Sequence, residues 1–318
     1  TRRSSDLTEA QRKRTSIIGS RSVRPLLDEY RLRCLTINTH RGQGPKLGLL
    51  LDKTKGEEAQ RVELLHETRA YAYFISEWLN HHSRRYDIVA LQEVFNGILG
   101  VSEKVIAKYR QRDHYRVLSG FDALIEHGVG FAGFRYQNLM LSQLPKLSDQ
   151  VYNQLMPGKV FFLASCGFTL APFLLKDSIV WIGNTHLHAY SPAARMRQAR
   201  SIAAVLRTLG DVPIVFMGDL NTVPAGHRIG DFGEGDIDRY NYRNDSTLSI
   251  LQDAGLRTVR HDDTLKFWTY PTGAPNRTLD YIMFSRHWHV RDYGVLHDFT
   301  LSDHYPVYAD LELITRSN

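Results

Sequence analysis

The chain has 318 residues, 42% of them hydrophobic, and a formal net charge of +6 at pH 7. This length allows one large buried core, and no apolar run approaches the roughly 18 residues that a membrane-spanning helix needs. The composition therefore excludes a membrane-spanning protein. We expect a soluble chain, although its compartment is not fixed: it is either cytoplasmic or exported after removal of an N-terminal segment.

The positive charge is concentrated at the N-terminus. Residues 1–33 hold nine Arg/Lys and four Asp/Glu, whereas the remaining residues hold 31 basic and 30 acidic side chains. We interpret residues 1–29 as a basic extension, either loosely ordered or in peripheral contact with an anionic membrane or nucleic acid. Residues 30–318 contain no linker-like segment, so we expect a single domain and a monomeric protein.

Apolar periodicity predicts strands interspersed with helices along the chain. Strands are predicted at 30–38, 86–91, 115–120, 128–134, 139–141, 160–170, 179–184, 214–217, 279–284 and 307–313. Helices are predicted at 57–82, 102–112, 193–209 and 246–255. Ser191 and Pro192 supply an N-cap and a first-turn proline to the third of these helices. This order favours two stacked sheets with helices outside them, while a doubly wound parallel sheet stays open.

Short polar segments lie at the ends of these predicted strands. They are Asn38, Gln92-Glu93, Thr185-His186-Leu187, Gly218-Asp219-Leu220-Asn221, Leu279-Asp280-Tyr281 and Ser302-Asp303-His304. Polar groups that recur at strand ends indicate a site built at one edge of a sheet.

The side chains of these segments predict a type of chemistry. They include four carboxylates, the two asparagine amides of Asn38 and Asn221, and two imidazoles. Oxygen donors suit a hard cation such as Mg²⁺ or Mn²⁺, whereas zinc sites more often use Cys or clustered His. Imidazoles move protons at neutral pH, and no Gly-x-Ser-x-Gly nucleophile motif is present. Direct attack of water on a phosphate ester is the reaction class that fits.

Taken in order, the same segments resemble the endonuclease/exonuclease/phosphatase superfamily, which has the DNase I-like fold. The resemblance extends from about Tyr30 to Leu313. It implies an α/β (α+β) fold: a four-layer sandwich of two mostly antiparallel β-sheets, packed face to face and flanked by helices. It also implies that the polar segments cluster at one edge of the sandwich.

The resemblance implies a role for each position. The metal ligands, for Mg²⁺ or possible Mn²⁺, are Glu93, Asn38 and Asp303. The catalytic residues are His304, Asp280, His186, Asp219 and Asn221.

Within that catalytic set, His304 resembles the general base and Asp280 its carboxylate partner. Asn221 and His186 resemble phosphate-binding groups, and Asp219 assists the nucleophile or the leaving group. His188 would share one side of an extended segment with His186, so it is a further candidate for substrate binding.

Three segments are similar to the neutral sphingomyelinase branch: 141–147, Gly167-Phe168 and 183–189. Cys166 departs from that branch, which commonly has Lys before the glycine. Residues 35–40 resemble uncharacterised bacterial members. We therefore expect an Mg²⁺-dependent phosphodiesterase acting on a phospholipid head group, of sphingomyelinase or phospholipase C type. A DNA or RNA endo- or exonuclease is the alternative, and a non-catalytic binding protein is the second alternative.

Overall fold

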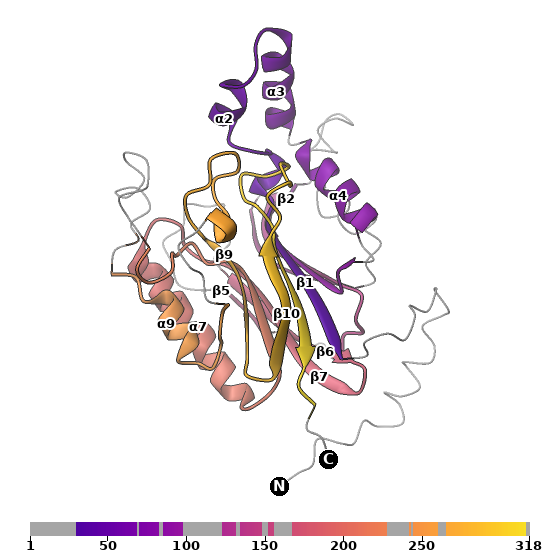
Figure 1. Cartoon of the computed structure of the whole chain (residues 1–318), viewed down its shortest axis with the longest axis vertical. Helices are drawn as coiled ribbons and strands as arrows, with labels where there is room; N and C mark the ends of the chain where they lie inside the picture. The colour runs from indigo at the N-terminus through magenta and orange to yellow at the C-terminus, as the bar shows by residue number, and fades with distance from the viewer. Residues whose placement is uncertain are drawn as a thin grey trace.

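The computed structural model describes residues 30–68, 70–82, 85–97, 123–131, 134–147, 152–155, 167–227, 242, 244–259 and 265–315 (Figure 1). Strands in this part of the chain form two sheets, of six and five strands. The six-stranded sheet has the order β10-β11-β1-β2-β4-β3. Its strands are β1 (Arg31–Asn38), β2 (Ile88–Gly97), β3 (Ala123–Phe131), β4 (Phe134–Ser142), β10 (Trp288–Val295) and β11 (Val307–Leu313).

The five-stranded sheet has the order β5-β6-β7-β8-β9. Its strands are β5 (Tyr152–Leu155), β6 (Gly167–Leu175), β7 (Ser178–His186), β8 (Ile214–Asp219) and β9 (Asp280–Phe284). Each sheet contains one parallel pair, β1 with β2 and β7 with β8, while the other described pairs are antiparallel. The prediction of two mostly antiparallel sheets is therefore confirmed, and the doubly wound parallel sheet is excluded.

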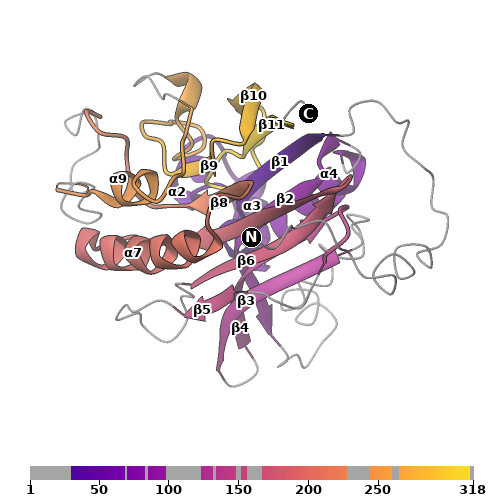
Figure 2. The same cartoon turned by 90° about the horizontal axis from the view of Figure 1, so that it is seen from below.

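Three apolar clusters hold the layers together. One lies between the sheets and includes Cys34, a buried free thiol. The second joins the outer face of the first sheet to α4 (Tyr71–His82). The third joins the outer face of the second sheet to α7 (Pro192–Leu209) and α9 (Thr247–Gln252). Figure 2 shows these helices on opposite sides of the stacked sheets, so the predicted four-layer sandwich is confirmed.

Helix α7 begins where the local sequence predicts. The Ser191 side chain accepts a hydrogen bond from the Ala194 backbone N–H at 3.3 Å, and Pro192 takes the first helical position. Gly210 ends the helix with φ of 72°, a conformation that glycine adopts without steric cost. Local capping chemistry therefore determined this element.

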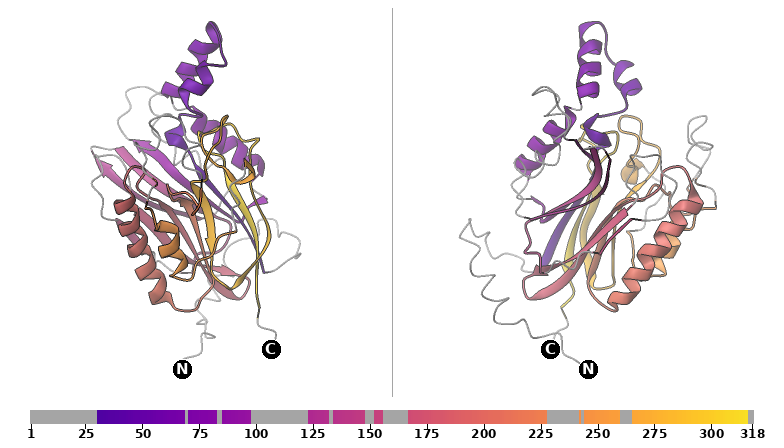
Figure 3. Two further views of the ribbon diagram at one scale, coloured as in Figure 1. Left: turned by 60° about the vertical axis from the view of Figure 1, so that its left-hand side comes forward. Right: turned by 180° about the vertical axis from the view of Figure 1, so that it is seen from behind.

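The predicted helix 57–82 is instead two helices, α3 (Glu57–Thr68) and α4. The Ala70 N–H bonds the carbonyl of Leu65, five residues back, which closes α3 before α4 starts. A short helix that was not predicted, α2 (Leu47–Leu51), precedes α3. Figures 1 and 3 show α2 and α3 projecting beyond the ends of the strands.

Further differences concern strands, and β5 was not predicted. Strand β10 was not predicted, because its alternation is irregular and its register against β11 shifts between Val290 and Asp292. Strand β2 does not stop at Gln92-Glu93 as predicted but continues to Gly97. The predicted elements 102–112 and 115–120, and residues 160–166 of the predicted strand 160–170, lie outside the described residues. No helix in the described ranges combines the length and the apolar character needed to cross a membrane.

Gly218 is required where β7 and β8 pair. Its φ is 140°, and a Cβ atom placed on it would lie 1.9 Å from the Thr185 carbonyl oxygen. We predict that Gly218→Ala lowers the free energy of unfolding by at least about 2 kcal/mol, because both the backbone and the strand pairing must shift. Chemical denaturation measures this change. The control is Gly48→Ala, where a Cβ meets nothing within 4 Å; equal losses in the two variants would contradict the prediction.

Candidate active site

Strand register alone brings the predicted residues together in pairs. Parallel pairing aligns Asn38 with Gln92 and His186 with Asp219. Antiparallel pairing of β8 with β9 aligns Asp219 with Asp280. The polar residues therefore meet at one end of both sheets because each lies at the corresponding end of its strand.

A β-bulge in β2 places Glu93. The register of β2 against β4 shifts between Leu91 and Val94, and Glu93 takes a positive φ of 55°. Such a bulge redirects a side chain without ending the strand. Glu93 thus turns toward the second sheet: its Oε1 lies 3.4 Å from Asn38 Nδ2 and 3.9 Å from His186 Nε2.

Buried amides tie the two sheets together beneath the site. Gln92 Nε2 donates to Asn184 Oδ1 at 2.8 Å, and the Asn184 amide donates to the carbonyls of Leu91 and Leu139. Above them, Asn38 Nδ2 donates to Asp219 Oδ2 at 2.9 Å. Sequence reasoning missed the roles of Gln92 and Asn184, although a polar side chain at the end of an apolar strand was the available signal.

His304 lies between two buried carboxylates. Its Nδ1 is 2.8 Å from Asp280 Oδ2, and its Nε2 is 3.8 Å from Asp219 Oδ2. His186 Nε2 lies 3.5 Å from the same Asp219 oxygen. The bond to Asp280 holds the imidazole so that Nε2 faces the centre of the site.

Asp303 and Glu93 each contact a basic side chain of the short 3₁₀ helix η1 (His40–Gly42). His40 Nδ1 lies 3.6 Å from Asp303 Oδ1, and Arg41 Nε donates to Glu93 Oε2 at 3.1 Å. The Ser302 hydroxyl donates to the Asn38 carbonyl at 2.6 Å, which fixes this loop beside β1. Two of the predicted metal ligands, Asp303 and Glu93, are thus in contact with η1. Arg41 is a site residue that the sequence did not reveal.

Asn221 and His188 take different positions. Asn221 is buried beside Asp219: its backbone N–H donates to Asp219 Oδ1 at 2.8 Å, and its amide donates to the Leu187 carbonyl. The His188 Nδ1 instead accepts from the backbone N–H groups of Tyr190 and Ser191. His188 therefore supports the turn into α7, a structural use of the ring that sequence spacing did not suggest.

Backbone strain is concentrated at the site. Six non-glycine residues in the described ranges have positive φ, and four of them are His40, Arg41, Glu93 and Asn221. Strain of this kind costs about 1–3 kcal/mol per residue and persists where the surrounding structure enforces it, which is common at active sites.

The buried charges shift pKa values in opposing ways. Burial lowers the pKa of His304, but Asp280 and Asp219 outweigh that effect and raise the pKa to about 10. Burial, reinforced by Asp280, raises the pKa of Asp219, whereas His304, His186 and Asn38 lower it. The neighbouring carboxylates thus stabilise the protonated, positively charged form of His304.

The donor set fits a divalent cation. Asp303 Oδ1 and Asp280 Oδ1 are buried, and neither accepts a hydrogen bond within the described residues. Buried carboxylate oxygens without donors are costly unless a cation or proton compensates them. Ligand atoms of Asp219, Asp280 and His304 also lie within 4.8 Å of one another. The His304 ring is already held by Asp280, which favours a proton-transfer role for it.

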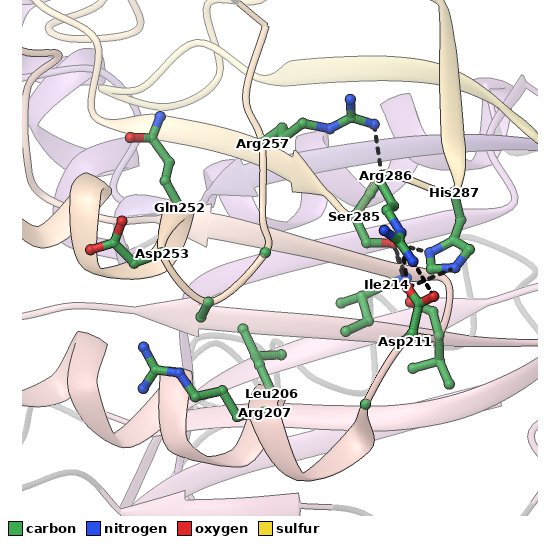
Figure 4. A pocket seen from close by; sticks show the side chains of 14 residues that line it. Leu206, Arg207, Asp211, Ile214, Gln252, Asp253, Arg257, Ser285, Arg286 and His287 are labelled. Carbon is green, nitrogen blue, oxygen red and sulfur yellow. Dashed lines mark hydrogen bonds and ion pairs between the residues drawn. The ribbon is translucent and has the colours of Figure 1, made fainter.

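A separate groove lies at the opposite end of β8 and β9 (Figure 4). There Ser285 Oγ is 3.0 Å from His287 Nδ1, and His287 Nε2 is 3.3 Å from Asp211 Oδ1. A Ser–His–Asp arrangement of this kind resembles those in which a histidine base activates a serine nucleophile. However, Ser285 Oγ also accepts from the Ile214 N–H and donates to the Val212 carbonyl, so it closes the strand ends and does not act as a nucleophile.

Comparison with known proteins decides the family. Residues 35–304 match the model of the Endonuclease/Exonuclease/phosphatase family. The chain belongs to the endonuclease/exonuclease/phosphatase family. No curated protein matches its sequence.

Solved structures share the family fold at low sequence identity. An endonuclease/exonuclease/phosphatase family protein from Bacteroides thetaiotaomicron is 18% identical, with a TM-score of 0.59, over 89% of this chain and 98% of that one. A mannosyl-6-phosphatase from the same organism is 18% identical, with a TM-score of 0.58, over 88% and 99%. The 2′,3′-cyclic phosphatase ANGEL2 is 15% identical, with a TM-score of 0.58, over 90% and 96%. At these identities the likeness establishes the fold of this family member.

The raised pKa of His304 predicts how stability depends on pH. The folded pKa of about 10 exceeds the ordinary histidine pKa of 6.5. The stabilisation from the protonated ring is therefore complete below about pH 6.5 and is lost as pH rises through about 10. We predict that, in chelator-treated protein, the difference in free energy of unfolding between wild type and His304→Gln shrinks across that range. In NMR titrations Asp280→Asn should lower the pKa of His304; a pH-independent difference in stability would contradict this electrostatic account.

Proposed function

We propose that this protein is a divalent-metal-dependent phosphodiesterase that hydrolyses its substrate by direct attack of water. The observation that supports this most strongly is the Asp280–His304 pair, whose Nε2 faces Asp219, the carboxylate that His186 also contacts. An oriented imidazole, a carboxylate-rich cation site and buried amide groups are the parts such hydrolysis requires. They also argue against a purely binding role on this scaffold.

Each residue has a step to perform. Asp280 holds His304 so that Nε2 accepts a proton from the attacking water. His186 and the Asn221 amide orient the phosphate oxygens, and Asn38 holds Asp219 in place through its 2.9 Å hydrogen bond. The leaving oxygen receives a proton from Asp219 or His186, whose side chains lie 3.5 Å apart.

Glu93, Asn38 and Asp303 would hold the cation, for which Mg²⁺ or Mn²⁺ fits the oxygen donors. When bound, the cation supplies positive charge that stabilises the negative charge developing on the phosphate and offsets the neighbouring carboxylates. The positive charge also favours a neutral His304, the form that a general base requires.

For the substrate we propose a phospholipid head group ester, with a sphingomyelinase or phospholipase C type of cleavage. The support is the sequence of segment 183–189, which is similar to the neutral sphingomyelinase branch, and the near balance of charge outside residues 1–33. Nucleic acid is the second candidate, which the basic extension 1–29 favours through contacts with phosphate groups.

A substrate panel tests this proposal. We predict Mg²⁺-dependent turnover of bis-p-nitrophenyl phosphate, and release of phosphocholine from sphingomyelin in mixed micelles that exceeds nicking of plasmid DNA. Nicking without phosphocholine release, with binding that weakens steeply as salt rises, would identify a nuclease. If no phosphodiester is cleaved with any divalent metal, the catalytic proposal is wrong.

Two variants separate metal binding from proton transfer. We predict that Glu93→Gln weakens Mg²⁺ binding about tenfold or more and lowers kcat with it, because a charged ligand is lost. His304→Ala should lower kcat by about 10²- to 10⁴-fold at saturating metal while metal affinity stays similar. Calorimetric metal titration and steady-state kinetics measure the two effects. An unchanged metal affinity in Glu93→Gln would refute the ligand assignment.

A further inference from the structure

The segment from Thr39 to Gly56 brings positive charge to one side of the site. It contains four Arg/Lys residues and one acidic residue, Asp52. Figures 1 and 3 show its helix α2 projecting with α3 beyond the strand ends, the same end at which the catalytic residues gather. A substrate bound at that end therefore approaches this segment.

Packing fixes the path of the segment. His40 Nδ1 lies 2.6 Å from the Gly44 carbonyl oxygen. Gly44 has φ of 82°, and a Cβ on it would lie 2.5 Å from the Tyr71 ring of α4. Only glycine fits between this turn and that ring. This packing fixes the backbone position of Lys46, the N-cap residue of α2, two residues further along the chain.

Lys46 is then held over an aromatic ring that contacts the proposed base. Its Nζ lies 4.6 Å from the centre of the Tyr270 ring, within the range of a cation–π interaction. The centre of the same Tyr270 ring lies 4.6 Å from that of the His304 ring. Tyr270 is buried, whereas Lys46 is only partly buried, so solvent reaches the lysine. The buried Arg277 guanidinium also lies 5.3 Å from the centre of this ring.

A second lysine of the segment lies nearby. A Cβ on Gly273, three residues beyond Tyr270, would lie 3.4 Å from Lys53 Nζ. The loop that carries Tyr270 is therefore flanked by two ammonium groups. Gly273 is itself fixed, because its N–H donates to the Tyr305 hydroxyl at 3.0 Å.

The Tyr270 ring links Lys46 to the place of the reacting phosphate. A water that attacks phosphorus must lie within hydrogen-bond distance of His304, so that phosphate lies next to the imidazole. The Tyr270 ring that contacts this imidazole also carries the Lys46 ammonium group, whose Nζ lies 4.6 Å from the ring centre. A cation carried by this ring is placed to reach a group that adjoins the scissile phosphate.

We infer that Lys46, supported by Lys53, binds a second anionic group of the substrate, a phosphate or carboxylate next to the ester that is cleaved. This inference rests on the proposed function, since it takes the site around His304 as the place of the scissile phosphate. It makes Lys46 a specificity-determining residue. The second anion is either part of one soluble molecule or a neighbouring head group in a lipid surface.

Calorimetry with inert ligands tests the inference without requiring turnover. The probes are propylphosphonate, with one anionic group, and α,ω-alkanebisphosphonates of three to six carbons, with two. In the presence of Mg²⁺, wild type should bind a bisphosphonate of one optimal length about tenfold more tightly than the monophosphonate. In Lys46→Met this ratio should fall to near one, and Lys46→Arg should restore it.

The matched control is Lys55→Met, the same substitution at an exposed lysine of the same segment. It should keep the wild-type ratio, and thermal unfolding of all variants verifies that each is folded. A wild type that binds both probes equally, or a Lys46→Met that keeps the preference, would overturn the inference. Because the probes are not hydrolysed, this result is independent of whether bis-p-nitrophenyl phosphate is cleaved.

Vesicles distinguish the two sources of the second anion. Phosphatidylcholine vesicles with and without phosphatidic acid are sedimented with wild type and Lys46→Met. Lys46-dependent binding to the phosphatidic acid vesicles assigns the second anion to a lipid surface. If the variants differ toward bisphosphonates alone, the second anion belongs to a soluble substrate.

Discussion

The contact between the two sheets at Gln92 and Asn184 is the constraint on which the site depends. One amide donates to the other at 2.8 Å in the buried space between β2 and β7. Because both groups are desolvated, breaking this bond would leave polar atoms without partners at a cost of about 1–3 kcal/mol. The bond therefore fixes where the bulge in β2 lies against the second sheet. That position in turn places Glu93 opposite His186 and not along the edge of its own sheet.

The site concentrates negative charge in a region with little water. Asp219, Asp280 and Asp303 are buried, and Glu93 is mostly covered. Burial disfavours ionised carboxylates, so the surroundings must supply compensating groups. In the protein these are the Asn38 amide, the imidazoles of His186 and His304, and the Arg41 guanidinium. The same arrangement raises the pKa of His304 to about 10. In the proposed mechanism one electrostatic balance therefore connects stability, metal binding and proton transfer.

Sequence reasoning succeeded where local rules determine structure. Helix α7 and strand β11 were predicted at nearly their observed bounds, because capping residues and regular apolar patterns act over a few residues. It failed where apolar periodicity does not reveal the feature that decides the outcome. Helix 57–82 was predicted as continuous because both halves are amphipathic, yet the Ala70–Leu65 bond closes the first half. Strand β10 exists because β11 pairs with it, and its own alternation is too irregular to reveal it.

By itself the sequence indicated the family and supplied most candidate residues, because the functional groups that hydrolysis of a phosphate ester would require lie at strand ends in a recognisable order. Only the tertiary structure decided how those groups face one another. Register paired Asp219 with Asp280, the bulge turned Glu93 inward, and the turn before α7 engaged His188. The structure also brought Lys46 over Tyr270, across 224 positions of sequence. Such contacts depend on packing between distant segments, which no local pattern of residues encodes.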